Sequence, residues 1–247
     1  MIWAKQTKGW GMGNFVNITP AIQTLYYVRD KTPVPLYFEE AYLKDLVIDW
    51  GMVKIIDSPP HTPPSVNTRW ANKYNGKDPD YRCIFDYVKQ EHITFSRLHH
   101  TYCDLVMEPQ LHTDYAVFIR GSIKGREQEK DPGEDIYRHA IKKCTEAGLK
   151  CVYVGVTYDY ERWGIDFVNS FFSVLGNLRA EMSYIMGAKF VVTNDTGLYH
   201  VGGAYQKKGF VMWKDTDPVK NATPNPNYYI SQKGNWFKDF DTWIQKQ

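Results

Sequence analysis

The 247-residue sequence lacks the features that mark several common protein classes. No uninterrupted apolar run reaches the roughly 18 residues that a membrane-spanning helix needs. The N-terminal residues show no signal-peptide core with a cleavage site, so we expect a cytoplasmic protein that begins at Met1. The motifs Gly-x-Ser-x-Gly, Gly-x-x-x-x-Gly-Lys-Ser/Thr and His-Glu-x-x-His are missing. Hydrolase, P-loop ATPase and metalloprotease functions therefore have no support.

The sequence also has little net charge and no obvious metal ligands. A net charge of +2 gives no reason to expect a nucleic-acid-binding protein. The cysteines show no Cys-x-x-Cys spacing, which favours buried thiols in a reducing compartment. Asp215 and Asp217 are two residues apart, and two carboxylates at this spacing could share one Mg²⁺. However, Pro218 follows directly, so an ordinary turn is favoured and we expect no metal and no other cofactor.

The first half of the chain alternates predicted strands and helices, which indicates a parallel sheet covered by helices. The five prolines between Asp57 and Pro79 predict a long loop without a regular element, and a helical stretch is expected between Tyr81 and Val106. The predicted elements are strands Ile2–Gln6, Val34–Phe38 and Val53–Ile56 and helices Asn14–Arg29 and Glu39–Val47.

The second half repeats this alternation. Its predicted strands are Tyr115–Ile119, Lys150–Val156, Phe172–Leu175, Lys189–Thr193 and Gly209–Trp213, and its predicted helices are Glu134–Ala147, Leu178–Met186 and Leu198–Tyr205. Two such series predict two Rossmann-type α/β domains, 1–112 and 113–247, with the junction near residues 108–113 and a ligand cleft between them. The last helix is free to pack back on the N-terminal domain.

The strongest local motif follows the buried strand that ends at Thr193. The next residues, Asn194-Asp195-Thr196-Gly197, suit a helix N-cap and a tight turn. Free N–H groups at the start of a helix attract anions, so a phosphate could bind there. His200 lies one helical turn further on. On spacing alone, a simple cap at Asp195 with His200 packed against the sheet explains the segment at least as well.

The segment Val192–Ala204 resembles glycosyltransferase family nine, the heptosyltransferase-like enzymes, whose pattern is a strand, Asp-(Ser/Thr)-Gly, two spacers, His and small residues. The segment Gly13–Ile22 is similar to the family's Gly-Asp start, which continues into Thr-Pro. The resemblance implies a GT-B fold of two Rossmann-like domains and metal-independent transfer of a sugar from a nucleoside-diphosphate sugar to the hydroxyl of a glycan or other acceptor. The chain is short for this family, so we expect a shortened N-terminal acceptor domain.

The resemblance also implies roles for individual residues. Asp195 would be catalytic, shaping the turn and contacting sugar hydroxyls. The basic residue that precedes a proline in the family's donor-phosphate loop has three candidates here: Lys124, Arg126 and Lys130. The full set of expected donor-binding residues is Arg120, Lys124, Lys130, Glu161, Thr196, Gly197 and His200. Gly11, Gly13 and Thr19 would form the acceptor-side loop.

One departure concerns the general base. The family usually has a catalytic Asp where this chain has Asn14, and an amide cannot accept a proton at neutral pH. Asn14 would keep this catalytic position but only orient the acceptor. Another carboxylate (Glu39, Glu40 or Asp45) or the donor phosphate would then take the proton. Other functions stay open: a non-catalytic nucleotide-sugar or glycan-binding module, a sugar-nucleotide epimerase, or a phage-type enzyme that glycosylates modified DNA bases through the loop Arg69–Arg82. Binding to nucleic acid is not favoured.

Overall fold

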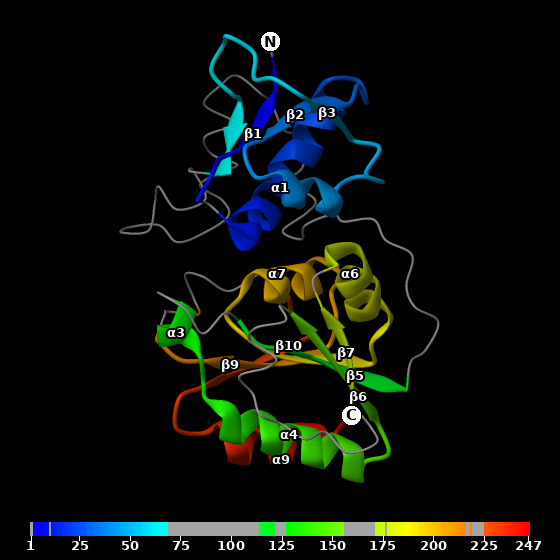
Figure 1. The fold of residues 1–247 in the computed structure, drawn as a ribbon, viewed down its shortest axis with the longest axis vertical. Coiled ribbons are helices and arrows are strands. Elements are labelled where there is room, and N and C mark those ends of the chain that lie inside the picture. The colour runs from blue at the N-terminus through cyan, green and yellow to red at the C-terminus, as the bar shows by residue number, and fades with distance from the viewer. Residues whose placement is uncertain are drawn as a thin grey trace. The chain divides into compact units, whose positions relative to one another are not determined.

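The computed structural model describes residues 2–9, 11–68, 114–121, 127–155, 171–175, 177–215, 218 and 225–247. The chain divides into two compact units (Figure 1): unit 1 is Met1–Val106 with Val219–Pro224, and unit 2 is Met107–Pro218 with Asn225–Gln247. Each unit has its own parallel sheet. The predicted junction at 108–113 and the predicted helix at 81–106 lie outside the described residues.

Unit 1 is built on a four-stranded parallel sheet of order β3-β2-β1-β4. Its elements are β1 (Ala4–Gln6), α1 (Met12–Val28), β2 (Val34–Phe38), the 3₁₀ helix η1 (Ala41–Leu46), β3 (Val53–Ile56) and β4 (Val66–Asn67). The predicted helix at 39–47 is thus a 3₁₀ helix of six residues. The prediction that 57–79 holds no regular element is wrong at β4. Four of the five prolines lie at or before Pro64 and the fifth is Pro79, so the residues in between are free to pair with β1.

Helix α1 carries a proline in its interior and remains continuous. Pro20 has no N–H, so the carbonyl of Val16 loses its usual i→i+4 donor. The hydroxyl of Thr19 replaces that donor, with Oγ1 lying 2.7 Å from the Val16 oxygen, and both residues are fully buried. The Thr-Pro pair therefore has a clear structural role within α1.

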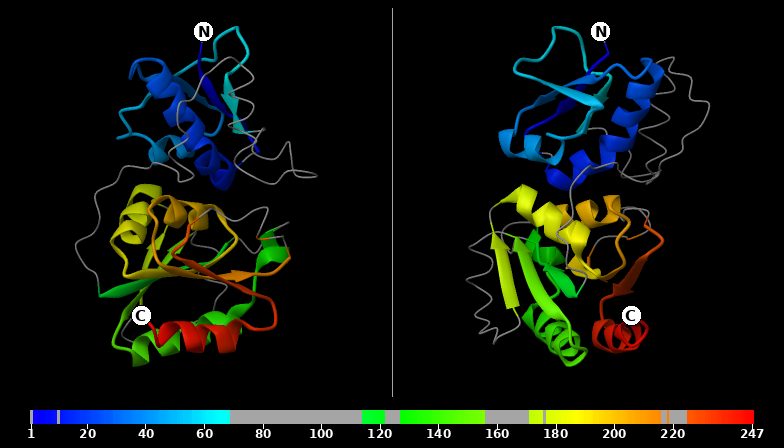
Figure 2. Two further views of the ribbon diagram at one scale, coloured as in Figure 1. Left: turned by 180° about the vertical axis from the view of Figure 1, so that it is seen from behind. Right: turned by 90° about the vertical axis from the view of Figure 1, so that its right-hand side faces the viewer.

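Unit 2 is built on a six-stranded parallel sheet of order β10-β9-β8-β5-β6-β7. Helices α6 and α7 cover one face and α4 and α9 the other (Figure 2). The strands are β5 (Tyr115–Ile119), β6 (Lys150–Gly155), β7 (Phe171–Leu175), β8 (Phe190–Asn194), β9 (Gly209–Trp213) and β10 (Tyr228–Gln232). The helices are α3 (Glu127–Lys130), α4 (Glu134–Glu146), α6 (Leu178–Gly187), α7 (Gly197–Ala204) and α9 (Trp236–Ile244).

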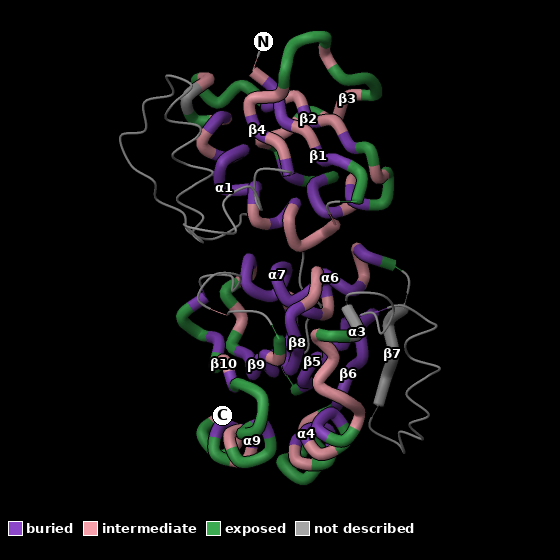
Figure 3. Tube along the Cα trace, turned by 90° about the vertical axis from the view of Figure 1, so that its left-hand side faces the viewer, coloured by how far each residue is buried: buried purple, intermediate pink, exposed green. Residues whose placement is uncertain are grey.

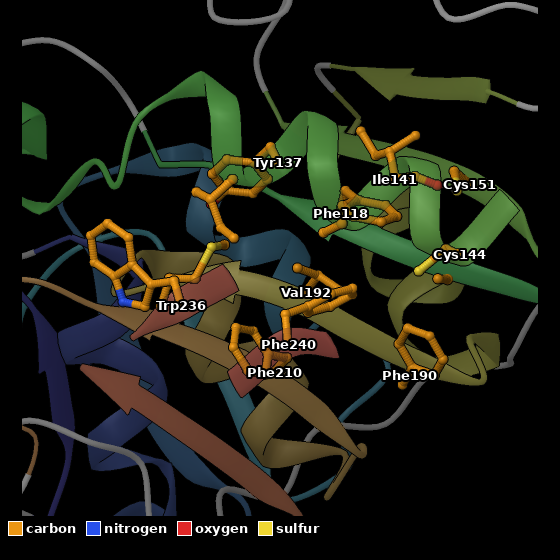
Figure 4. Close-up of a cluster of buried hydrophobic side chains, with 14 of the residues drawn as sticks. Phe118, Tyr137, Ile141, Cys144, Cys151, Phe190, Val192, Phe210, Trp236 and Phe240 are labelled. Carbon is orange, nitrogen blue, oxygen red and sulfur yellow. Dashed lines mark hydrogen bonds between the residues drawn. The ribbon is translucent and has the colours of Figure 1, made fainter. Parts of the chain in front are cut away.

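The C-terminal helix α9 packs within unit 2, beside α4. Its apolar side chains, Trp236, Phe240 and Trp243, join Phe190 and Phe210 of the sheet in one buried cluster (Figure 4). The outer sides of α4 and α9 are exposed, whereas the central strands are buried (Figure 3). The sequence allowed this helix to return to the N-terminal domain, but its apolar face is already buried in its own unit.

Strand β10 was not predicted from the sequence. It pairs in parallel with β9 along Tyr228–Gln232 and forms an edge of the sheet. Its two ends carry Ser231, Gln232 and a tyrosine pair, so the strand lacks the continuous apolar run that marks the central strands.

No helix among the described residues is long and apolar enough to cross a membrane.

Candidate functional site

The candidate site lies along the side of the unit 2 sheet where the carboxyl ends of its strands lie, and this side is called the sheet edge from here on. Strands β9, β8 and β5 are parallel neighbours, so their carboxyl ends meet at the same edge. The polar residues that follow these ends are Arg120 and Gly121 after β5, Asp195 and Thr196 after β8, and Lys214 after β9. This edge brings together residues that are more than 90 positions apart in the sequence.

The turn between β8 and α7 presents the start of a helix at this edge. Thr196 is the N-cap, with an extended backbone (φ −147°, ψ 168°) and no capping hydrogen bond from its side chain. The first N–H groups of α7 have no acceptor within the helix, so they are available to an anion. Gly121 lies against this turn, since a Cβ atom there would come within 3.1 Å of the Thr196 Cβ. A side chain at position 121 would therefore require Thr196 to shift by a few tenths of an ångström.

A lysine is placed next to the helix start by an ion pair. Lys130 ends α3, and its Nζ lies 3.0 Å from Oδ2 of Asp195. The Asp195 side chain is only 8% exposed, whereas that of Lys130 is 26% exposed. The pair therefore holds an accessible cationic group beside the N-terminus of α7.

Residues 130 and 131 are also bonded by side chains from the strand ends. Arg120 donates two hydrogen bonds to the Asp131 carboxylate, Nε to Oδ1 (2.8 Å) and Nη2 to Oδ2 (2.6 Å). Asn194 Nδ2 donates to the Lys130 carbonyl (3.2 Å), and Lys214 Nζ donates to the Asp131 carbonyl (2.9 Å).

His200 lies in α7, one turn after the N-cap, and is buried. Burial lowers its pKa to about 4, with a further lowering from Lys130 that the negative charge of Asp195 opposes. The imidazole is therefore neutral at neutral pH. Its ring packs edge-on against Tyr199 at a centroid distance of 4.9 Å.

The structure brings together most of the residues predicted for donor binding. Arg120, Lys130, Thr196, Gly197 and His200 all belong to unit 2 and lie at or next to the same sheet edge, together with Asp195, which was predicted to be catalytic. Lys124, Arg126 and Glu161 lie outside the described residues. Asp131, Asn194 and Lys214 had no separate predicted role. Nothing in the local sequence marks these three, because their partners lie on other elements of the fold.

The residues predicted for the acceptor side lie in unit 1. Gly11 is the N-cap of α1, and Gly13 and Asn14 lie in its first turn. The prediction that Thr19 belongs to a loop is wrong, because Thr19 lies inside α1 with its side chain fully buried. Gly13 is also helical, so the predicted acceptor-side loop is shorter than expected.

The two candidate bases that follow β2 are engaged with the β1–α1 connection. Glu39 accepts from the Lys8 N–H (2.7 Å) and lies 2.6 Å from Lys5 Nζ. Glu40 accepts from Gln6 Nε2 (2.8 Å), and Gly9 N lies 3.4 Å from its Oε1. These carboxylates shape the loop that precedes α1.

The described part of the chain contains no group of three or more His, Cys, Asp or Glu side chains that could hold a metal ion. Asp215 is half-exposed and lies 3.9 Å from Lys214 Nζ, while its predicted partner Asp217 is outside the described residues.

Comparison with known proteins agrees with this arrangement. E. coli heptosyltransferase WaaC with ADP superposes with a TM-score of 0.74 at 14% identity, covering 100% of this chain and 99% of that one. E. coli ADP-heptose lps heptosyltransferase II gives 0.70 at 11% identity, with coverage of 100% and 99%. A glycosyl transferase family 9 protein from Veillonella parvula DSM 2008 gives 0.71 at 10% identity, with coverage of 98% and 88%.

These structural matches confirm the predicted α/β, GT-B-like fold. A search of curated proteins found no match. Residues 86–242, well over half of the chain, match glycosyltransferase family 9 (heptosyltransferase). They include the whole β8–α7 turn, one of the two segments that carry the resemblance, whereas the other, Gly13–Ile22, lies outside the match. The protein therefore belongs to glycosyltransferase family 9 and is a sugar-transferring enzyme.

Proposed function

We propose that the sheet edge of unit 2 binds the diphosphate of a nucleoside-diphosphate sugar, and that the enzyme transfers this sugar to a hydroxyl of a glycan acceptor. The observation that carries the proposal is the Lys130–Asp195 ion pair beside the N-terminus of α7. A cationic side chain and unused backbone N–H groups meet at one point, and both favour phosphate oxygens. WaaC, which superposes on this chain, has a structure with ADP, which supports a nucleotide ligand.

The proposed reaction places its greatest demand on the leaving group. The bond between the anomeric carbon and the diphosphate oxygen breaks, and the diphosphate takes the electron pair. Negative charge therefore grows on the phosphate as the acceptor oxygen forms its bond to the same carbon. Fixed donors aimed at that charge lower the barrier, because they need little reorganisation during the reaction. Lys130 and the N–H groups of Gly197 and Leu198 supply such donors.

Asp195 and His200 have complementary proposed roles. Asp195 holds Lys130 in place before the donor binds, and its carboxylate is a suitable acceptor for sugar hydroxyls. His200 is neutral, so it offers a hydrogen bond without adding charge. We propose that the reaction needs no metal, because the lysine and the helix N-terminus already place positive charge beside the leaving phosphate.

On the acceptor side, we propose that the leaving diphosphate takes the proton of the acceptor hydroxyl. Asn14 cannot accept it, Glu39 and Glu40 are engaged with the β1–α1 loop, and Asp45 lies within the 3₁₀ helix η1. We place the reaction in the cytoplasm, in line with the cysteine spacing and with Cys144 and Cys151, which are buried free thiols.

A thermal-shift panel of ADP, GDP, UDP, CDP and TDP tests the donor proposal. We expect one diphosphate to raise the melting temperature clearly more than its own nucleoside does, because the phosphates make the main contacts. The matching nucleotide sugars are then incubated with glycan acceptors, and release of the diphosphate is measured. Stabilisation by none of the diphosphates would overturn the proposed donor site. Binding without turnover on any acceptor would instead support a binding module.

A further inference from the structure

The Lys130–Asp131 dipeptide is held from three neighbouring strand ends. The side chains that hold it are Arg120 after β5, Asn194 at the end of β8 and Lys214 after β9, and we call these three residues the clamp. We propose that the clamp residues are positioning residues: they fix the ammonium group of Lys130 at the N-terminus of α7 before any ligand arrives. The identity of the ligand rests on the proposed function, whereas the positioning itself is a property of the free protein.

Arg120 holds the side chain of Asp131. The two hydrogen bonds are parallel and both are short, 2.8 and 2.6 Å, which is the strong bidentate geometry of arginine with a carboxylate. The guanidinium carbon lies 5.6 Å from the centre of the Tyr137 ring, and Arg120 is only 8% exposed. A guanidinium held on both sides in this way fixes Asp131. We therefore infer that Arg120 acts through Asp131, in place of the direct donor contact that the sequence suggested.

Asn194 holds the backbone of Lys130. Its amide nitrogen donates to the Lys130 carbonyl, while its amide oxygen accepts from the Gly121 N–H at 3.0 Å. The Tyr137 hydroxyl lies 3.2 Å from the same oxygen. With 1% exposure, Asn194 has no water to replace these partners. One amide thus ties the end of β5, the end of α3 and helix α4 together.

Lys214 completes the clamp from β9. Its ammonium group donates to the Asp131 carbonyl at 2.9 Å, so both carbonyls of the dipeptide are bonded to side chains from the sheet. Helix α3 has only four residues and offers little stability of its own. The position of Lys130 must therefore come from the clamp and from the ion pair with Asp195.

The functional value of the clamp lies in preorganisation. A lysine side chain has many rotamers, and ordering it during binding or reaction costs free energy. The clamp holds the two carbonyls of the dipeptide and the Asp131 side chain, so only the Lys130 side chain remains to be ordered. The ion pair with Asp195 orders it. Catalysis by electrostatic stabilisation requires donors that are already in place as charge develops.

Hydrogen exchange in the free protein tests the clamp without any ligand. Asn194→Ala should speed amide exchange across residues 127–133 by about tenfold or more, since this segment then opens locally. Asn225→Ala is the matched control: Asn225 is also buried, its amide donates to a lysine carbonyl (Lys207, 2.8 Å), and it lies at the opposite edge of the sheet. Unchanged exchange at 127–133 in Asn194→Ala, or equal acceleration in the control, would overturn the proposal.

Lys214→Met provides a second variant that keeps the buried core intact, because the Lys214 side chain is 24% exposed. It should accelerate exchange in the same segment, by a smaller factor, because the other two clamp residues remain. If Asn194→Ala fails to fold, this variant decides the question: protection at 127–133 equal to the wild type would contradict the clamp.

A double-mutant cycle connects the clamp to function. With the nucleoside diphosphate that the thermal-shift panel selects as probe, Asn194→Ala should weaken binding about tenfold or more. Adding it to Lys130→Ala should cause little further loss, because a residue that acts through Lys130 has no effect once Lys130 is gone. Fully additive losses would overturn the positioning role. Unchanged binding in Lys130→Ala would refute the proposed donor site, and the exchange result would still stand.

Discussion

The two sheets of this enzyme use opposite chemistry at the loops that follow their strands. In unit 2, cationic and amide donors hold the carbonyl groups and carboxylate of the Lys130–Asp131 dipeptide. In unit 1, the carboxylates of Glu39 and Glu40 lie against N–H groups of the β1–α1 loop. The first arrangement leaves positive charge beside a helix N-terminus, and the second surrounds a loop with acidic groups.

This difference favours anion binding in unit 2 and does not favour a general base among the carboxylates after β2. A site for an anion needs positive charge and N–H donors in one place, and unit 2 has both. A general base needs a carboxylate with oxygens free to receive a proton, and the acidic residues after β2 already hold the loop.

The largest effect is expected for Lys130→Ala. Removing one donor to a developing negative charge lowers the rate by about 10²–10³-fold, and we expect kcat/KM for transfer to fall by that factor. Lys150→Ala is the matched control, since Lys150 also pairs with an aspartate at 3.0 Å but starts β6, at the opposite edge of the sheet. The measurement is kcat/KM for both variants by steady-state kinetics, and only Lys130→Ala should show the loss. Equal activity of the two variants would remove the functional contrast between the sheet edges.

His200 predicts a pH dependence of stability. Its pKa is about 4 in the folded protein and 6.5 when exposed, so the unfolded state binds the proton first. Stability is therefore lost as the pH falls from about 6.5 towards 4. At about 1.4 kcal/mol per pKa unit, the loss from this group is about 3 kcal/mol. The measurement is the free energy of unfolding in urea at pH 7 and at pH 4.5. Between these two pH values, His200→Gln should lose less stability than the wild type, by the contribution of this histidine. His139→Gln, which alters a histidine at the α4 surface, should retain it.

Thr19→Val tests the structural role assigned to this residue in unit 1. The variant leaves the Val16 carbonyl buried without a donor, because Pro20 cannot replace the hydroxyl. We expect a loss of about 1–3 kcal/mol in the free energy of unfolding. Thr24→Val on the same helix should cost less, since its own N–H can still bond the Pro20 carbonyl. A change in acceptor KM at unchanged stability would contradict this interpretation.

The smallest expected effect is a gain. Asn14→Asp supplies a carboxylate where related enzymes have one, and we expect kcat to rise by about tenfold, less than the 10²–10⁴-fold of an optimised base. Asn17→Asp adds the same charge one turn later on α1 and should give no gain. The comparison is made by measuring kcat with the acceptor that supports turnover. A fall in kcat for Asn14→Asp would indicate that the amide itself orients the acceptor.

Much of the fold could be predicted from local sequence patterns. The bounds of β2, β3, β5 and β9 agree with the prediction residue by residue, because short apolar runs between turn residues have few alternatives. The errors have physical reasons. Strand β4 exists through its pairing with β1, and β10 exists through its pairing with β9. Neither strand has a strong pattern of its own, so only long-range contacts reveal them.

For the site, the sequence by itself determined the β8–α7 turn, because the strand, the N-cap residue and the glycine are consecutive and their geometry is local. This turn also carries the more specific part of the family resemblance, and it lies within the matched residues 86–242. Only the tertiary structure decided which basic groups act directly and which act through others. Arg120, Asn194 and Lys214 are separated by up to 94 positions, and it is the parallel order of β5, β8 and β9 that brings them to one dipeptide. Spacing along a chain cannot encode that convergence, since it depends on which strands become neighbours.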